Sequence, residues 1–201
     1  MMKRYIQFLF VLFFLFQSIK AQDAELLKGL QDHFNSIKDF SADLVQLNNG
    51  RVNLKGKIFF KKENNLRLEL KNIFIVSDGK TNWNYNKKLK KVIISNYDKN
   101  DPSVLSLKRI IFDYPAKCEV SETVEKGENV LVLKPRPDSG INADLIKIWI
   151  NKENNVSRVS ASGSSGNNIE VRFSDYKINA GIPDSKFSFT PPLGTKVIDL
   201  R

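Results

Sequence analysis

The stretch SDGKTNWNY, residues 77–85, combines a tight turn with an alternation of aromatic and amide side chains. Its first four residues have turn chemistry, because aspartate can hydrogen-bond its own backbone and glycine accepts a positive φ without steric cost. In the extended chain that follows, successive side chains point to opposite faces, so Trp83 and Tyr85 share one face and the interleaved asparagines share the other. The stretch predicts a hairpin strand whose two faces differ sharply in polarity.

Period-two patterns continue on both sides of this hairpin and predict a protein made mainly of β-strands. In residues 52–60 apolar side chains alternate with polar ones, and Gly56 allows a bend or a bulge. Turn-forming segments separate the alternating runs. Extended segments are predicted at residues 40–47, 52–60, 66–70, 73–76, 83–85, 92–94, 118–124, 129–134, 145–151, 156–162 and 169–176, followed by a turn or short helix near residues 184–186 and a last extended piece.

Two segments have the apolar spacing of amphipathic helices. Residues 23–38 carry one apolar stripe, and Asp23 is a suitable N-cap. A second, short helix is predicted to start at Asp101-Pro102-Ser103 and to include Phe112. The stripe of the first helix comprises Leu26, Leu27, Leu30, Phe34 and Ile37.

The order of these elements predicts an α+β fold. About ten or eleven strands with hairpin-length connections favour one antiparallel sheet, which must twist and curl strongly at that size. Curled into an open, incomplete barrel, such a sheet has a concave apolar face. The amphipathic helices are the elements available to cover that face.

The N-terminus has the pattern of a secretory signal peptide. The basic residues Lys3 and Arg4 precede Phe8–Phe16, an unbroken apolar run of nine residues. A retained membrane anchor is the alternative, but the run is short for a span, which needs about 20 residues. We therefore expect a signal peptide at residues 1–21, cleavage before Gln22, and one periplasmic domain at residues 22–201.

The charge of the chain indicates an acidic or amphiphilic partner. The full sequence has 32 basic and 22 acidic side chains, a net charge of +10. Removal of Lys3, Arg4 and Lys20 with the signal peptide leaves 29 basic side chains and a net charge of +7. Such a surplus is compatible with nucleic acid, anionic lipid or acidic proteins. Export argues against nucleic acid as the partner.

A search for catalytic or metal-binding groups favours a protein that is not an enzyme and needs no cofactor or metal. His33 is the only histidine and Cys118 the only cysteine, which excludes metal sites built from His and Cys pairs. His33 lies in the helical pattern, and Cys118 lies in an alternating segment where a packed side chain is expected. The sequence at residues 163–167 only approximates a G-x-S-x-G elbow, and no second histidine is present to act as a base.

Four stretches, in order along the chain, resemble the motifs of the outer-membrane lipoprotein carrier family, LolA. Residues 77–85 resemble its SDGKT-x-W-x-Y signature, and residues 39–46 resemble its F-x-A-x-F-x-Q first strand. Residues 56–68 are similar to its G-x-aromatic-x-K-R-P-x-x-F-R-W strand pair, with Lys62-Glu63 in place of Arg-Pro. Residues 187–199 are similar to its F-x-F-T-P-P-x-G-V-x-V-I-D ending.

The resemblance implies a monomeric periplasmic chaperone with an open barrel closed by helices. Such a protein accepts acylated lipoproteins from an inner-membrane, ATP-driven release complex and delivers them to an outer-membrane acceptor. Two other interpretations remain: a binding or sensory domain on the same fold, and a carrier of a phospholipid or glycolipid. Nucleic acid is not an expected partner in any of them.

Alternation and the resemblance together predict which residues bind acyl chains. We expect the lid to consist of apolar side chains on the two helices, and Lys62 and Arg67 to latch it by bonding helix-end or loop carbonyls. We expect Trp83 and Tyr85 to face the cavity and the asparagines to face water; the alternative is that both rings fill an ordinary core. The predicted cavity residues are Leu44, Ile58, Phe60, Leu66, Leu68, Trp83 and Tyr85, and the predicted lid residues are Leu27, Leu30, Phe34 and Phe112.

Overall fold

The computed structural model describes residues 25–98, 107–163 and 166–201. The predicted signal peptide at residues 1–21 lies outside the described residues, as do the predicted starts of both helices, Asp23 and Asp101-Pro102-Ser103. None of the helices in the described residues combines the length and the hydropathy that a membrane span requires.

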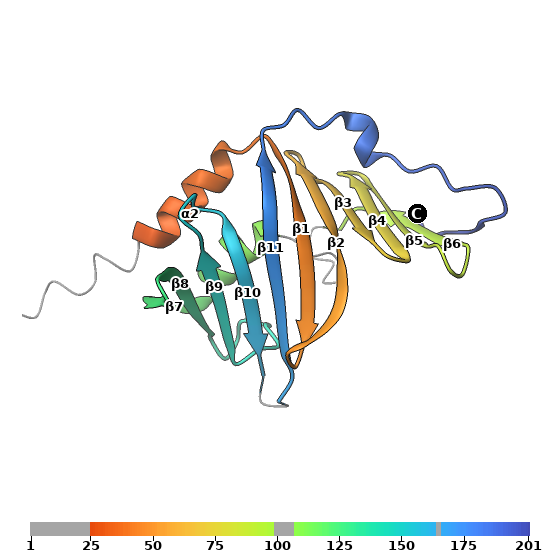
Figure 1. Ribbon diagram of the computed structural model, residues 1–201. Helices are drawn as coiled ribbons and strands as arrows, with labels where there is room; N and C mark the ends of the chain where they lie inside the picture. The colour runs from red at the N-terminus through yellow and green to blue at the C-terminus, as the bar shows by residue number, and fades with distance from the viewer. Residues whose placement is uncertain (1–24, 99–106, 164–165) are drawn as a thin grey trace, which may run out of the picture.

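One sheet of twelve strands forms the body of the protein (Figure 1). Its strands lie in the order β12-β6-β5-β4-β3-β2-β1-β11-β10-β9-β8-β7, and all neighbours are antiparallel except β12 and β6. The prediction of an open antiparallel sheet is confirmed, and the last extended piece adds a strand to the number expected. The strands are β1 (Asp39–Asn48), β2 (Arg51–Lys61), β3 (Asn65–Leu70), β4 (Ile73–Asp78), β5 (Thr81–Asn86), β6 (Lys91–Asn96), β7 (Cys118–Glu125), β8 (Glu128–Pro135), β9 (Leu145–Ile150), β10 (Val156–Ser162), β11 (Asn168–Ile178) and β12 (Lys196–Asp199).

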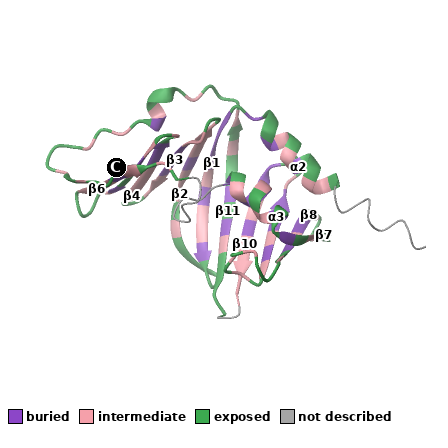
Figure 2. Cartoon of the chain, turned by 180° about the vertical axis from the view of Figure 1, so that it is seen from behind, coloured by how far each residue is buried: buried purple, intermediate pink, exposed green. Residues whose placement is uncertain are grey.

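Short helices cover one half of one face of this sheet. The α-helix α2 (Glu25–Ser36) lies over β8, beside the π-helical turn η2 (Arg109–Asp113) and the single turn α3 (Tyr114–Ala116). Strands β3–β6 extend beyond these helices (Figure 2). The predicted helix at residues 23–38 therefore exists, and its apolar stripe faces the sheet as expected.

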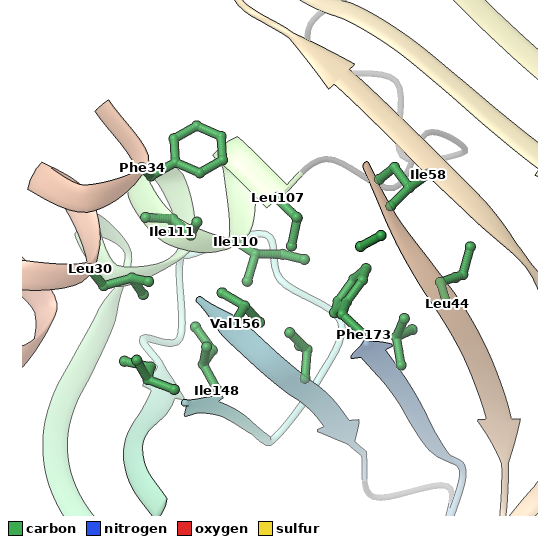
Figure 3. Packing of buried hydrophobic residues seen from close by; sticks show 14 of the residues in the cluster. Leu30, Phe34, Leu44, Ile58, Leu107, Ile110, Ile111, Ile148, Val156 and Phe173 are labelled. Carbon is green, nitrogen blue, oxygen red and sulfur yellow. The ribbon is translucent and has the colours of Figure 1, made fainter. Parts of the chain in front are cut away.

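The hydrophobic core lies between these helices and the sheet. Register places one row of apolar side chains across strands β11, β10, β9 and β8 on the face that the helices cover. Leu30 from α2 and Ile111 from η2 pack down onto this row (Figure 3). The row comprises Val171, Val159, Ile148 and Leu131, all of them buried.

Two glycines are required where backbone segments approach closely. Gly56 lies in β2, where a β-carbon would stand 2.2 Å from the carbonyl oxygen of Glu69 in β3. Gly79 has φ +83°, and a β-carbon there would stand 2.5 Å from the carbonyl oxygen of Glu63. In the same turn Asp78 Oδ1 accepts the backbone N–H groups of Lys80 at 2.9 Å and Thr81 at 2.7 Å. The turn chemistry predicted for residues 77–80 is confirmed.

The segment after β11 runs to the opposite side of the sheet and ends as its edge strand. It contains a single 3₁₀ turn, η3 (Asp184–Phe187), and then continues to β12, which pairs in parallel with β6 (Figure 1). Phe187 is buried with 1% of its surface exposed, and Phe189 packs against Tyr85 in a second apolar cluster. This C-terminal segment therefore covers part of the sheet's other face, the one on which the helices do not lie.

Candidate functional site

The two faces of the sheet are distinguished by strand register. We call the face that carries Leu44, Ile58 and Leu68 the helix face, because α2 and η2 pack on it. The opposite side is the outer face. Ala42 pairs with Ile58, and Ile58 pairs with Leu68, so these side chains point to the same side of β1, β2 and β3.

On the helix face, two cross-strand rows run from the covered half to the open half. Both rows are apolar in β2 and β3. The first becomes polar at Ser77 in β4, whereas the second is interrupted only by Asn84 in β5 and is apolar again in β6 and β12. One row consists of Phe60, Leu66, Ser77, Asn82 and Ser95, and the other of Ile58, Leu68, Ile75, Asn84, Ile93 and Ile198.

In the covered half, the predicted lid residues contact the predicted cavity residues. The ring of Phe34 on α2 lies 5.4 Å from that of Phe60 in β2 and 6.0 Å from that of Phe112 on η2. Leu30 is buried in the same cluster, and Leu27 packs at its margin. The predicted cavity residues that belong to this cluster are Leu44, Ile58, Phe60, Leu66 and Leu68.

Among the described residues, side chains of the protein itself pack closely in the interior beneath the helices. Ile58, Ile111 and Leu131 each have 1% or less of their surface exposed. A cavity of about 20 Å³ lies between α2 and β10, beside Leu30 and Val156. That volume holds about one water molecule and no acyl chain. The space between α2 and β10 is therefore closed to an acyl chain in this structure.

In the open half, apolar side chains on the helix face remain only partly covered. Leu54, Leu70 and Ile75 pack at the margin of the core cluster, and Ile93 is also half-buried. Asn84, between Ile75 and Ile93, is exposed. Sequence analysis did not assign these residues to the site, although Leu70 and Ile75 continue the alternation that identified Leu68.

Trp83 and Tyr85 lie on the outer face, so the predicted orientation of this strand is wrong. Register pairs Trp83 with Val76 and Ile94, on the side opposite Leu68. The ring of Tyr85 lies 5.2 Å from that of Phe189 in the C-terminal segment and is stacked with Phe74 at 6.3 Å. The interleaved Asn82 and Asn84 lie on the helix face instead. The alternative interpretation, that both rings fill a core, describes their packing.

The two predicted latch residues bond different segments of the chain. Lys62 Nζ donates a hydrogen bond of 2.6 Å to the carbonyl oxygen of Asn35, in the last turn of α2. Arg67 is on the outer face, where its Nη1 donates to the carbonyl oxygen of Lys186 at 3.3 Å. The expectation that Arg67 bonds the lid is therefore wrong, because alternation turns its side chain toward the C-terminal segment.

An ionic group on the outer face reinforces the attachment of that segment. Glu69 Oε1 accepts hydrogen bonds from Arg67 Nε at 2.7 Å and from Lys186 Nζ at 2.9 Å. Partial burial acts to raise the pKa of Glu69, but the bonds from Lys186 and Arg67 outweigh it and hold the pKa below its ordinary value of 4.5. The Lys186 ammonium also lies 4.0 Å from the ring centre of Phe59.

The residue types that most often carry chemistry have structural contacts here. His33 Nε2 lies 3.0 Å from Asn155 Oδ1, which joins α2 to the turn before β10. Cys118 is buried, and burial raises the pKa of its thiol. Among the described residues no group of three or more His, Cys, Asp or Glu side chains is arranged to hold a metal ion.

The sequence of residues 35–190 matches the family model described as outer membrane lipoprotein carrier protein LolA. The chain belongs to this family. The match extends from the end of α2 to the C-terminal segment that covers Tyr85, so it includes both faces of the sheet.

Individual relatives agree with the family assignment. The chain is 28% identical over 191 residues to the outer-membrane lipoprotein carrier protein of Francisella philomiragia, covering 90% of this chain and 92% of that one. It is 25% identical over 195 residues to an uncharacterized protein of Methanocaldococcus jannaschii and spans about half of that longer protein, 53%. An uncharacterized conserved protein of Thermus thermophilus has the same fold, with a TM-score of 0.59 at 13% identity over 86% of this chain and 98% of that one.

Proposed function

We propose that this protein is a lipoprotein carrier that binds acyl chains on its helix face and transports its cargo from the inner to the outer membrane. The observation that carries the proposal is the half-covered helix face. Its apolar surface extends past the described helices to the partly exposed Leu70, Ile75 and Ile93. Membership of the lipoprotein carrier family supports the same role.

The energetics of acyl transfer explain why such a face is needed. Each methylene removed from water contributes about 0.8 kcal/mol, so a lipoprotein with several long chains carries a penalty of tens of kcal/mol in the periplasm. Apolar side chains such as Leu54 and Ile75 offset this penalty without directional bonds. A face of this kind therefore accepts many cargos and can also release them.

Because the covered half is filled, cargo enters it only if the helices move. The Phe34–Phe60 and Phe34–Phe112 contacts join α2, β2 and η2, and the Lys62 hydrogen bond holds the C-terminal end of α2. When the lid opens, Phe34 leaves Phe60 and exposes the sheet surface beneath it. Acyl chains that bind in its place cover this surface again. In this proposal α2 and η2 form the lid, and Lys62 is its latch.

Location and partners follow from the same proposal. The signal peptide at residues 1–21 directs the chain to the periplasm, where residues 22–201 act as a single-domain monomer. An inner-membrane, ATP-driven release complex loads it with an acylated lipoprotein, and an outer-membrane acceptor receives the cargo.

Neighbouring positions on β5 provide a direct test, because they point to opposite faces. Asn84→p-benzoylphenylalanine places a photoreactive group on the helix face, and Trp83→p-benzoylphenylalanine places it on the outer face. Irradiation in the periplasm is expected to crosslink an acylated lipoprotein from position 84 and not from position 83. Crosslinking from position 83 alone would assign cargo to the wrong face and contradict the proposal.

A carrier of a phospholipid or glycolipid is the second candidate, and one feature favours it. Lys91 and Lys196 are paired neighbours at the β6–β12 edge, next to Asn86, and they suit an anionic head group. Native mass spectrometry of protein purified from its own periplasm separates the candidates. A bound lipoprotein supports the first, whereas a bound phospholipid or glycolipid supports the second.

A further inference from the structure

A short polar row interrupts the apolar helix face. Ser77 in β4, Asn82 in β5 and Ser95 in β6 are direct cross-strand partners, so their side chains stand next to one another on this face. Leu66 precedes Ser77 in the same row, and Ile75 is the next residue on the same face of β4. The polar row therefore begins next to the apolar side chains of Leu66 and Ile75.

Asn82 is the unusual member of the row. Only 7% of the surface of Asn82 is exposed. Neither its amide nitrogen nor its amide oxygen has a hydrogen-bond partner among the described residues. A buried polar group without a partner costs about 1–3 kcal/mol. Ser77 is also buried, and its Oγ accepts the N–H of Gly79 at 3.2 Å.

The chemistry of the row selects a neutral ligand group. A carboxamide offers two N–H donors and one acceptor, and each hydroxyl can donate one proton. Asn82 and its two serine neighbours carry no charge, whereas a site for phosphate or carboxylate typically provides arginine or lysine. An uncharged carbonyl oxygen is the group that suits these donors.

We infer that Asn82, together with Ser77, binds the ester carbonyl that joins an acyl chain to its carrier molecule. This inference rests on the proposed function. It places the hydrocarbon over Leu66 and Ile75 and the carbonyl at the first polar strand position beyond them. The cargo thus lies across the sheet with its acyl chains toward β2 and its head toward β6.

Binding of an ester-linked and an ether-linked lipid tests the inference with the full chain. The probes are a dipalmitoyl-glyceryl cysteine peptide and its dihexadecyl ether analogue, which lacks the two ester carbonyls. The wild-type protein is expected to bind the ester form about tenfold more tightly, as one hydrogen bond from a buried donor allows. Asn82→Leu and the smaller Asn82→Ala are expected to bind the two peptides about equally.

Asn53→Leu is the matched control, since it makes the same change at an exposed position of β2 on the outer face. It is expected to keep the tenfold preference. Equal binding of both peptides by the wild type, or an unchanged preference in both Asn82 variants, would overturn the inference and leave the carrier proposal intact. If the wild type binds neither peptide, the proposed function itself fails.

Discussion

At the residue scale, Glu69 connects strand β3 to the C-terminal segment that covers the outer face. Its carboxylate accepts bonds from Arg67 on its own strand and from Lys186 in η3. Because the pKa of Glu69 is lowered in the folded protein, the folded state favours the charged form more strongly than the unfolded state does. This contribution to stability is fully present above the unfolded pKa and is lost as pH falls through the lower folded pKa.

We expect Glu69→Gln to reduce the free energy of unfolding at neutral pH and to have little effect in acid. The difference from wild type should stay constant above the ordinary pKa of 4.5 and shrink as the pH falls below it. Urea unfolding between neutral pH and pH about 3 measures the difference. Glu63→Gln, at an exposed position in the β2–β3 turn, is the control. If the loss of unfolding free energy in Glu69→Gln does not change with pH, the charge of Glu69 does not stabilise the folded protein.

Individual residue roles could be predicted where local chemistry is decisive. Gly79 and Asp78 form the expected turn, because a positive φ and a short acceptor are local requirements. Lys62 bonds a helix-end carbonyl, as expected from the resemblance, in which a basic side chain stands at this position. The unpartnered amide of Asn82 could not be predicted, since it depends on three strands meeting in one register.

At the scale of elements, the strands and α2 were predictable because their periods are distinct. The orientation of β5 was not predictable, because a period of two separates the two faces of a strand but does not show which face is on the side of the helices. The usual assumption, that the apolar face of a strand meets the helices, fails at β5, because its apolar face packs against the C-terminal segment. Phe189 covers Tyr85 on the outer face, and Arg158 stacks on the buried Trp149 at 3.8 Å.

Adjacent lysines at the end of β2 allow the attachment of two elements to be tested separately. Lys62 bonds the carbonyl of Asn35 in α2, whereas Lys61 bonds the carbonyl of Ile182 at 3.1 Å and the carboxylate of Asp184. Lys62→Met should increase hydrogen exchange in α2 and leave η3 unchanged, because only the tie to the helix is lost. Lys61→Met should have the opposite effect.

Amide exchange read by mass spectrometry over residues 25–36 and 183–189 measures both changes. A faster opening of α2 by roughly tenfold corresponds to the loss of about 1.4 kcal/mol, slightly less than a hydrogen bond to a charged group typically contributes, as expected for an exposed bond. If Lys62→Met leaves exchange in α2 at the wild-type rate, the tie does not restrain the helix, and the proposed latch is wrong.

At the scale of the whole molecule, one sheet serves two different purposes. Part of its outer face is covered by the chain's own C-terminal segment, so Trp83 and Phe189 belong to one apolar cluster there. The helices of the described residues cover only one half of its helix face (Figure 2). The fold class could be predicted from strand number and helix pattern. The close packing of the interior could not be predicted from the sequence, because it depends on how the helices pack against the sheet.

The closed interior leads to a prediction about the whole carrier. If acyl chains displace Phe34 from Phe60, cargo must move α2 away from the sheet, because a space for about one water molecule cannot hold a hydrocarbon chain. Spin labels at Gly29→Cys on α2 and Lys55→Cys on β2 should therefore move apart by several ångströms when the dipalmitoyl-glyceryl peptide saturates the protein. Cys118 is buried and remains in place.

The control for this measurement is a pair of labels that both lie on the sheet, at Lys55→Cys and Ser174→Cys on β2 and β11. Their separation should not change with cargo, because β1 joins the two strands along its whole length. An increase confined to the helix–sheet pair requires a hinged lid, since the sheet then stays rigid while α2 leaves it. If saturation leaves both separations unchanged, the acyl chains occupy only the open strip at Leu70 and Ile75, and α2 is a fixed part of the core.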